Sequence, residues 1–155
     1  MNILMVCLGN ICRSPTAHGV LQKKLNDKGL DWVKVDSAGT AAYHVGKLPD
    51  ARAIAAAKAR GYDLTSLRAR QVNNDDFFKF DYIFAMDHQN LIDLKKRQPD
   101  ESQAKVVMAM SFSQIGVIEV PDPYYGGGEG FDEVLDICER MSDDIIRKVI
   151  QESTL

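Results

Sequence analysis

The chain has 155 residues, of which 45% are hydrophobic, and its formal net charge is −3 at pH 7. This length is expected to give a single domain over residues 1–155 with one adequate core. The negative charge argues against a nucleic-acid partner, and no apolar stretch reaches the ~20 residues that a membrane span needs. Because the first residues also lack the pattern of a cleavable signal, we expect a cytoplasmic protein that binds neither nucleic acid nor membrane.

Strand and helix patterns alternate along the chain. In chain order we predict a strand at 2–6, a helix at 15–28, a strand at 33–37, helices at 50–60 and 74–78, a strand at 82–85, a helix at 87–97, a strand at 105–108 and a helix at 131–151. Ser14 followed by Pro15 is typical of a helix N-cap and first turn. The alternation favours an α/β fold, a four-stranded parallel sheet with helices on both faces.

The loop after the first predicted strand carries Cys7 and Arg13, which five residues separate. Main-chain N–H groups of a short loop that contains glycine can converge on one anion, and the positive end of the following helix adds to their field. The Arg13 guanidinium can hold two phosphate oxygens at once. We therefore predict a phosphate-binding loop formed by Leu8, Gly9, Asn10, Ile11, Cys12, Arg13 and Ser14.

The same positive field should favour the thiolate form of Cys7, which is the form that acts as a nucleophile. The Ser14 hydroxyl can donate to that sulfur and later to the departing thiolate. A simpler interpretation makes Ser14 only a helix cap, and the two roles are compatible.

The chain resembles the low-molecular-weight protein tyrosine phosphatases from about residue 3 to about residue 150. Besides the loop, the matching blocks are Asp36-Ser37-Ala38-Gly39-Thr40, Arg68-Ala69-Arg70-Gln71, Phe80-Asp81-Tyr82-Ile83 with Met86-Asp87, and Asp122-Pro123-Tyr124-Tyr125. The resemblance implies hydrolysis of phosphotyrosine and small aryl phosphates through a cysteinyl-phosphate, without cofactor or metal. It also implies phosphotyrosine proteins as partners, among them a tyrosine kinase.

Asp122 is the general acid that the resemblance implies. Taken by itself, Pro121-Asp122-Pro123 is an ordinary turn sequence. Attack by Cys7 on an aryl phosphate, however, expels a phenolate that needs a proton. Asp122 would supply that proton in the first step, and as a carboxylate would then activate water in the second.

The resemblance further implies that Ser37, with Asn10 and Ser14, braces the phosphate loop by hydrogen bonds. Without it, Ser37 reads as part of a turn that ends a strand. Many relatives carry a histidine where this chain has Leu67, which predicts that one member of the bracing network is missing.

Four residues are predicted to form the walls of the substrate pocket: Tyr43, His44, Tyr124 and Tyr125. Aromatic walls would favour phosphotyrosine over the shorter phosphoserine, which cannot reach the bottom of a deep pocket. Exposed tyrosines are also common without any function. We expect His18 and His88 to be solvated helix residues.

Three cysteines without an even framework indicate a reducing compartment. Cys138 lies on a helical stripe of apolar residues and is expected in the core. Cys12 shares the loop with Cys7, and the family resemblance suggests a transient Cys7–Cys12 disulfide; otherwise Cys12 only packs the loop.

Two other functions stay open at this point. An arsenate reductase can share this loop and fold, but it needs a further cysteine relay for which Cys138 is the candidate. A phosphoprotein-binding module without catalysis would use the loop alone. The oligomeric state is expected to be a monomer or weak dimer.

Overall fold

Four parallel strands form one sheet in the computed structural model, which describes residues 1–126 and 129–152. The strands are β1 (Asn2–Cys7), β2 (Lys34–Gly39), β3 (Tyr82–Ala85) and β4 (Lys105–Met108), in the order β2-β1-β3-β4. In the register, Ile3 of β1 lies opposite Val35 of β2 and Tyr82 of β3. The predicted four-stranded parallel sheet is confirmed.

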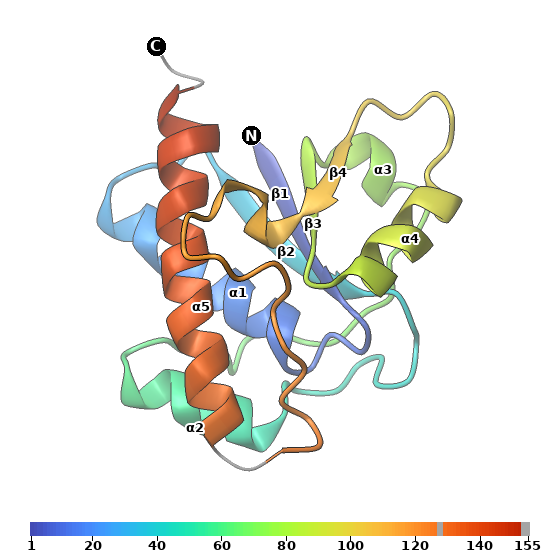
Figure 1. The fold of residues 1–155 in the computed structure, drawn as a ribbon. Helices are drawn as coiled ribbons and strands as arrows, with labels where there is room; N and C mark the ends of the chain where they lie inside the picture. The colour runs from blue at the N-terminus through green and yellow to red at the C-terminus, as the bar shows by residue number, and fades with distance from the viewer. Residues whose placement is uncertain (127–128, 153–155) are drawn as a thin grey trace.

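Helices cover both faces of this sheet, as predicted. They are α1 (Arg13–Asp27), α2 (Ala51–Ala59), α3 (Asp76–Lys79), α4 (His88–Arg97) and α5 (Glu129–Ile145), with a 3-10 turn η1 (Ala109–Phe112) and a π-helical end η2 (Ile146–Gln151). Figure 1 shows α1, α2 and α5 together on one side of the strands and α3 and α4 on the other. Among the residues described, no helix has the length and apolar character needed to cross a membrane.

The alternation of side chains along β1 explains the two layers of core. Ile3 and Met5 join the cluster that packs against α1 and α5, whereas Leu4 and Val6 join the cluster that contains residues of α3 and α4. All four side chains are completely buried. Each such burial is worth roughly 1.5–3 kcal/mol relative to exposure, so β1 is anchored in the core on both of its faces.

The first helix begins two residues earlier than predicted, and its N-cap is Cys12 rather than Ser14. The carbonyl of Cys12 already accepts hydrogen bonds from the main-chain N–H of Thr16, at 3.3 Å, and from the Thr16 hydroxyl, at 2.7 Å. Ser14 therefore lies inside the first turn of α1, and its hydroxyl is available for other contacts. The predicted N-cap role of Ser14 is wrong.

The strand order proceeds from β1 in both directions across the sheet. β1 pairs with β2 on one side and with β3 on the other. In parallel α/β sheets a crevice opens beyond the carboxyl end of such a strand, because the flanking connections leave in opposite directions. The loop from Leu8 to Cys12 lies at this end of β1.

Candidate active site

The sulfur of Cys7, the last residue of β1, lies inside the turn that follows it. The main-chain N–H of Asn10 points at the sulfur over 3.3 Å, and the Ser14 hydroxyl oxygen lies 3.1 Å from it. Asn10 has a φ of 57°, in the left-handed region that asparagine tolerates better than most residues. The turn and the start of α1 therefore bring a main-chain N–H and a hydroxyl to one sulfur atom.

Gly39, at the end of β2, is needed because the loop lies directly against it. A Cβ atom at this position would lie 2.7 Å from the carbonyl oxygen of Leu8 and 3.2 Å from the main-chain nitrogen of Asn10. Beyond it, the N–H groups of Thr40 and Ala41 donate to the carbonyls of Cys7, at 2.9 Å, and Leu8, at 3.0 Å. The end of β2 therefore holds the loop through its main chain.

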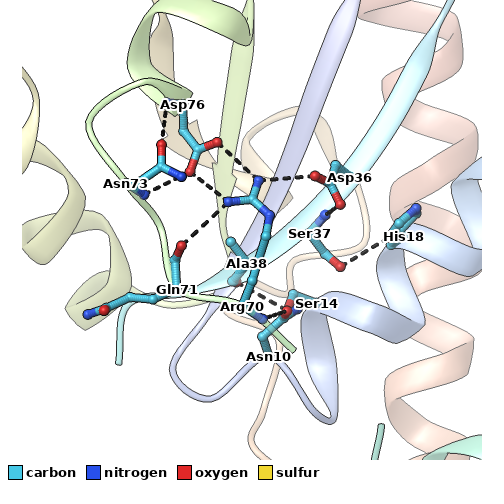
Figure 2. A network of polar contacts seen from close by, with 10 residues as sticks. All are labelled: Asn10, Ser14, His18, Asp36, Ser37, Ala38, Arg70, Gln71, Asn73 and Asp76. Atoms are coloured by element: carbon cyan, nitrogen blue, oxygen red, sulfur yellow. Dashed lines mark hydrogen bonds and ion pairs between the residues drawn. The ribbon is translucent and has the colours of Figure 1, made fainter. Parts of the chain in front are cut away.

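Asn10 and Ser14 are linked across the loop (Figure 2). The Asn10 amide donates to the Ser14 hydroxyl oxygen over 2.7 Å, and its carbonyl oxygen accepts the main-chain N–H of Arg70 at 3.0 Å. The Ser14 hydroxyl also lies 3.4 Å from the carbonyl of Ala38. Leu67, where we predicted that a member of the bracing network is missing, packs against the core.

Contrary to our expectation, Ser37 makes no hydrogen bond to the phosphate-binding loop, residues 8–14, within the described part of the chain. Its hydroxyl lies 3.0 Å from Nδ1 of His18, on α1. The register explains the difference, because Ser37 lies opposite Met5, whose side chain faces α1. Our expectation for His18 is also wrong, since its ring is half-buried against β2 rather than solvated.

The buried position of His18 has a consequence for stability against acid. Burial lowers the pKa of His18 below its ordinary value of 6.5. Below pH 6.5 the unfolded chain takes up a proton at His18 before the folded protein does. The free energy of unfolding therefore falls as the pH drops from 6.5 through the lower folded-state pKa. We expect the melting temperature of His18→Gln to fall less between pH 7 and pH 5 than that of the unchanged protein.

The control for this measurement is His88→Gln, since the His88 side chain is 60% exposed. This variant should not flatten the pH dependence of the melting temperature. If His18→Gln and the unchanged protein lost stability in parallel over this range, protonation of His18 would not oppose folding.

Arg13 directs its guanidinium toward the same loop from the first turn of α1. One nitrogen donates to Asp87 at 2.6 Å and to the carbonyl of Val120 at 3.3 Å, and the other lies 3.6 Å from an Asp122 carboxylate oxygen. Burial by itself disfavours the charged form, but Cys7 and the carboxylate of Asp87 raise the pKa of Arg13 above its ordinary value. Arg13 is therefore a cation that its partners hold in place at the pocket lined by Cys7.

Asp87 is a site residue that sequence reasoning missed. One of its oxygens caps α4 by accepting the N–H of Asn90 at 2.7 Å, while the other accepts from Arg13. The position of an aspartate before a helix predicts the cap. Nothing in the sequence places Arg13, 74 residues away, against the second oxygen.

Asp122 reaches the loop because its segment runs along the end of β3. The N–H of Val120 donates to the carbonyl of Met86 over 2.8 Å, directly after β3. One Asp122 oxygen accepts the N–H of Tyr124 at 3.0 Å, and the side chain is 39% exposed. The carboxyl group is thus oriented by its own turn and open to the space above Cys7.

These groups line one pocket of about 300 Å³. Its lining comprises Cys7, Leu8, Gly9, Ile11, Cys12, Arg13, Tyr43, His44, Asp122, Tyr124 and Tyr125. The four predicted wall residues are therefore brought together with the predicted catalytic ones. Asn10 and Ser14 lie behind the lining, where both are buried.

Arg52 was not predicted as part of this site. Its guanidinium lies 5.5 Å from the ring centre of Tyr124 and donates to the Tyr124 carbonyl over 3.1 Å. The rings of Tyr124 and Tyr125 meet edge to face at 4.9 Å. The contact between Arg52 and Tyr124 ties the start of α2 to the segment that carries Asp122.

The two remaining cysteines lie in different surroundings. Burial, with a further contribution from Asp50, raises the pKa of Cys12 to about 12, and Cys12 lines the pocket. Burial also raises the pKa of Cys138, which is completely buried, to about 12. The predicted core position of Cys138 is confirmed.

Known proteins are similar to this chain over nearly its whole length. The family model described as low molecular weight phosphotyrosine protein phosphatase matches residues 2–154. A putative low molecular weight protein-tyrosine-phosphatase of Synechocystis is 41% identical over 155 residues, which cover 98% of each chain.

Solved structures agree with this match. A protein tyrosine phosphatase from Entamoeba histolytica superposes with a TM-score of 0.94 at 43% identity, covering 100% of this chain and 99% of that one. The Drosophila arginine phosphatase superposes with a TM-score of 0.88 at 32% identity, covering 95% of this chain and 96% of the other. This chain belongs to the family of low molecular weight phosphotyrosine protein phosphatases.

Proposed function

We propose that this chain hydrolyses phosphotyrosine in proteins, and small aryl phosphates, through a cysteinyl-phosphate intermediate. The observation that carries the proposal is the convergence of Cys7, Arg13 and Asp122 on one pocket with aromatic walls. A nucleophile, a fixed cation and a proton donor are the three groups that phosphate-ester cleavage by displacement requires.

In the first step the Cys7 thiolate attacks phosphorus, and the bond to the leaving aryl oxygen breaks. Arg13 and the loop N–H groups stabilise the charge on the phosphoryl oxygens in the transition state. Arg13 already donates to Asp87 and faces Asp122, so its charge is held in place before substrate arrives. Protonated Asp122 gives its proton to the leaving oxygen, which departs as a phenol.

In the second step water attacks the phosphorus of the cysteinyl-phosphate. Asp122, now a carboxylate, takes a proton from that water, and the S–P bond breaks to return the thiolate and phosphate. The Ser14 hydroxyl, 3.1 Å from the sulfur, donates a hydrogen bond to the thiolate as it departs. The chemistry uses the protein's own groups.

The pocket walls support an aromatic substrate. Tyr43 and His44 line one part of the pocket, and Tyr124 and Tyr125 line another. A phosphotyrosine ring between them would gain burial and aromatic contacts that phosphoserine lacks. Phosphoarginine is a useful competitor in the test, because one structural relative is named an arginine phosphatase.

The proposal is tested by turnover of p-nitrophenyl phosphate and of phosphotyrosine and phosphoarginine peptides that share one sequence. We expect the highest kcat/KM on the phosphotyrosine peptide, and acid quenching during turnover should trap phosphate on Cys7. Turnover without any trapped phosphoenzyme would contradict the mechanism, and preference for phosphoarginine would contradict the substrate class.

The physiological partners follow from this activity. We expect phosphotyrosine proteins as substrates, including a tyrosine kinase. Separately, we expect the protein to be a monomer or weak dimer in solution. All three cysteines are free thiols, which supports a reducing compartment such as the cytoplasm.

The two alternative functions have their own tests. Arsenate reduction coupled to thioredoxin would require a cysteine relay, and the complete burial of Cys138 disfavours it. A binding module would bind phosphotyrosine peptides without releasing phosphate, and the placement of Asp122 over the loop is of no use to such a module.

Cys12 gives the loop a second thiol for reversible oxidation. Peroxide would convert the Cys7 thiolate to a sulfenic acid, and attack by the Cys12 sulfur would then form a disulfide and release water. With a pKa raised to about 12, Cys12 stays protonated at neutral pH, so Cys7 is the thiol expected to be oxidised first.

We therefore expect Cys12→Ser to recover less of its own starting activity than the unchanged protein does, when each is treated with peroxide and then with reductant. Mass spectrometry should find a Cys7–Cys12 linkage in the unchanged protein before reduction. Equal recovery of both proteins would count against a protective disulfide.

A further inference from the structure

We propose that the ion pair of Arg70 and Asp76, completed by Asp36, is the positioning element of the phosphate-binding loop. It holds the main-chain N–H of Arg70 against Asn10, and through Asn10 it orients the Ser14 hydroxyl on Cys7. The inference deepens the proposed function and rests on it, because it concerns the reactivity of the proposed nucleophile. Figure 2 shows these contacts from Asp76 and Asp36 through Arg70 and Asn10 to Ser14.

The Arg70 guanidinium is held on both of its outer nitrogens. One nitrogen lies 2.9 Å from an Asp76 oxygen, and the other lies 3.0 Å from the second Asp76 oxygen and 3.0 Å from Asp36. The Asp76 side chain is only 5% exposed and also accepts the main-chain N–H of Asn73 at 2.9 Å. A two-pronged pair of this kind fixes the arginine in direction as well as in distance.

The main chain of Arg70 is held at the edge of the sheet by Gly39 of β2. Its carbonyl accepts the N–H of Gly39 at 2.8 Å, and the carbonyl of Gly39 accepts the N–H of Val72 at 2.8 Å. The side chain then ties this segment to Asp36 on β2 and to Asp76 at the start of α3. The N–H of Arg70 is left pointing at Asn10.

The hydrogen bonds of Asn10 transmit this position to the sulfur. Because the Asn10 carbonyl oxygen accepts from Arg70, its amide nitrogen must face the other way and donates to the Ser14 hydroxyl oxygen. That hydroxyl has one proton of its own to give, and its acceptors are Cys7 at 3.1 Å and the carbonyl of Ala38 at 3.4 Å. A thiolate is a stronger acceptor than a carbonyl, so this arrangement directs the Ser14 proton to the sulfur when Cys7 acts as the nucleophile.

Among the residues that the structure describes, neither Ser37 nor Leu67 gives the loop a side-chain hydrogen bond, and the Arg70 main chain supplies one instead. Ser37 contacts His18, and Leu67 packs against the core. Arg70 contributes its main chain to the loop, while its charge is neutralised by carboxylates on the far side. The ion pair of Arg70 with Asp76 and Asp36 can therefore be removed without changing any residue that lines the pocket.

The first test replaces Asp76 with asparagine, which keeps the shape and removes the charge. We expect kcat for p-nitrophenyl phosphate to fall about tenfold, which equals about 1.4 kcal/mol of barrier. The pH at which iodoacetamide alkylation of Cys7 reaches half its maximal rate should rise. KM should change less than kcat, since the phosphate contacts of the loop remain. Asp36→Asn should have a smaller effect in the same direction, because Asp36 makes one contact to Arg70 and is 42% exposed.

Arg60 offers a matched control for the arginine itself. Its side chain is 29% exposed, against 30% for Arg70, and it also pairs with carboxylates, those of Asp132, Asp136 and Glu139. Arg60→Gln should lower the melting temperature without moving kcat or the alkylation profile. Arg70→Gln should lower the melting temperature and kcat and also shift the alkylation profile. Arg70→Lys should recover part of the loss in kcat.

A second test asks whether the effect passes through Asn10. Asn10→Gly removes the amide and suits the φ of 57° at this position. On that background Asp76→Asn should slow alkylation of Cys7 no further. If Asp76→Asn slows alkylation of Cys7 by the same factor with and without Asn10→Gly, the proposal is overturned. It is also overturned if Asp76→Asn lowers the melting temperature but leaves kcat and alkylation unchanged. If Asp76→Asn does not fold, Asp36→Asn is judged by the same criteria. Because alkylation needs no turnover, a failure of the proposed phosphatase activity would be distinguishable.

Discussion

Cys7→Ser is expected to lower kcat for p-nitrophenyl phosphate by at least about 10⁴-fold, since a serine hydroxyl is scarcely ionised near neutral pH. The change leaves Arg13 and the loop N–H groups in place, so binding of inorganic phosphate should persist. Side-chain volume changes little at this site, which is buried. Turnover measured against phosphate affinity by calorimetry separates the nucleophile from the anion-binding loop.

Cys138→Ala is the control for this experiment. It removes another thiol from the same chain, in the completely buried face of α5 and outside the pocket lining. We expect it to lower the melting temperature, because a buried side chain is truncated, while turnover per folded molecule is maintained. A Cys7→Ser protein that kept substantial turnover would remove Cys7 from the mechanism.

The elements that carry the chemistry could be predicted because they depend on local signals. The apolar run of β1 and the six-residue step from Cys7 to Arg13 are contiguous patterns. The role of Asp122 was instead implied by the resemblance to the family, because its turn by itself is an ordinary one. The parallel sheet follows from the alternation of strands with helices. The convergence of Tyr43, His44, Tyr124 and Tyr125 on the pocket also agrees with their predicted placement.

Contacts between distant segments could not be predicted in the same way. Asp87 is visible in the sequence as a helix cap, but its second oxygen binds Arg13. Ser37 was assigned to the loop, yet the direction of its side chain depends on the register of β2 against β1. Side-chain direction in a strand reverses with each residue, so an error of one position changes the partner.

Asp122→Ala is expected to lower turnover by about 10²–10⁴-fold on substrates whose leaving group needs a proton, the usual scale for general acid catalysis. The loss should be greater for phenyl phosphate than for p-nitrophenyl phosphate, because p-nitrophenolate leaves readily without protonation. Asp122→Asn is the matched control: its amide oxygen can still accept the N–H of Tyr124 and orient the turn, but it cannot transfer a proton. Equal losses in the two variants would assign the effect to chemistry rather than to the position of the loop.

The two roles of Asp122 predict different rate-limiting steps for the two substrates. With p-nitrophenyl phosphate, attack by Cys7 still proceeds in Asp122→Ala, but the water of the second step lacks its base. Phosphorylated Cys7 should then accumulate in rapid acid quench, preceded by a burst of p-nitrophenol. With phenyl phosphate the first step becomes limiting, so no phosphoenzyme should build up. An Asp122→Ala protein with full activity, or with the same loss on both substrates and no burst on either, would show that another group transfers these protons.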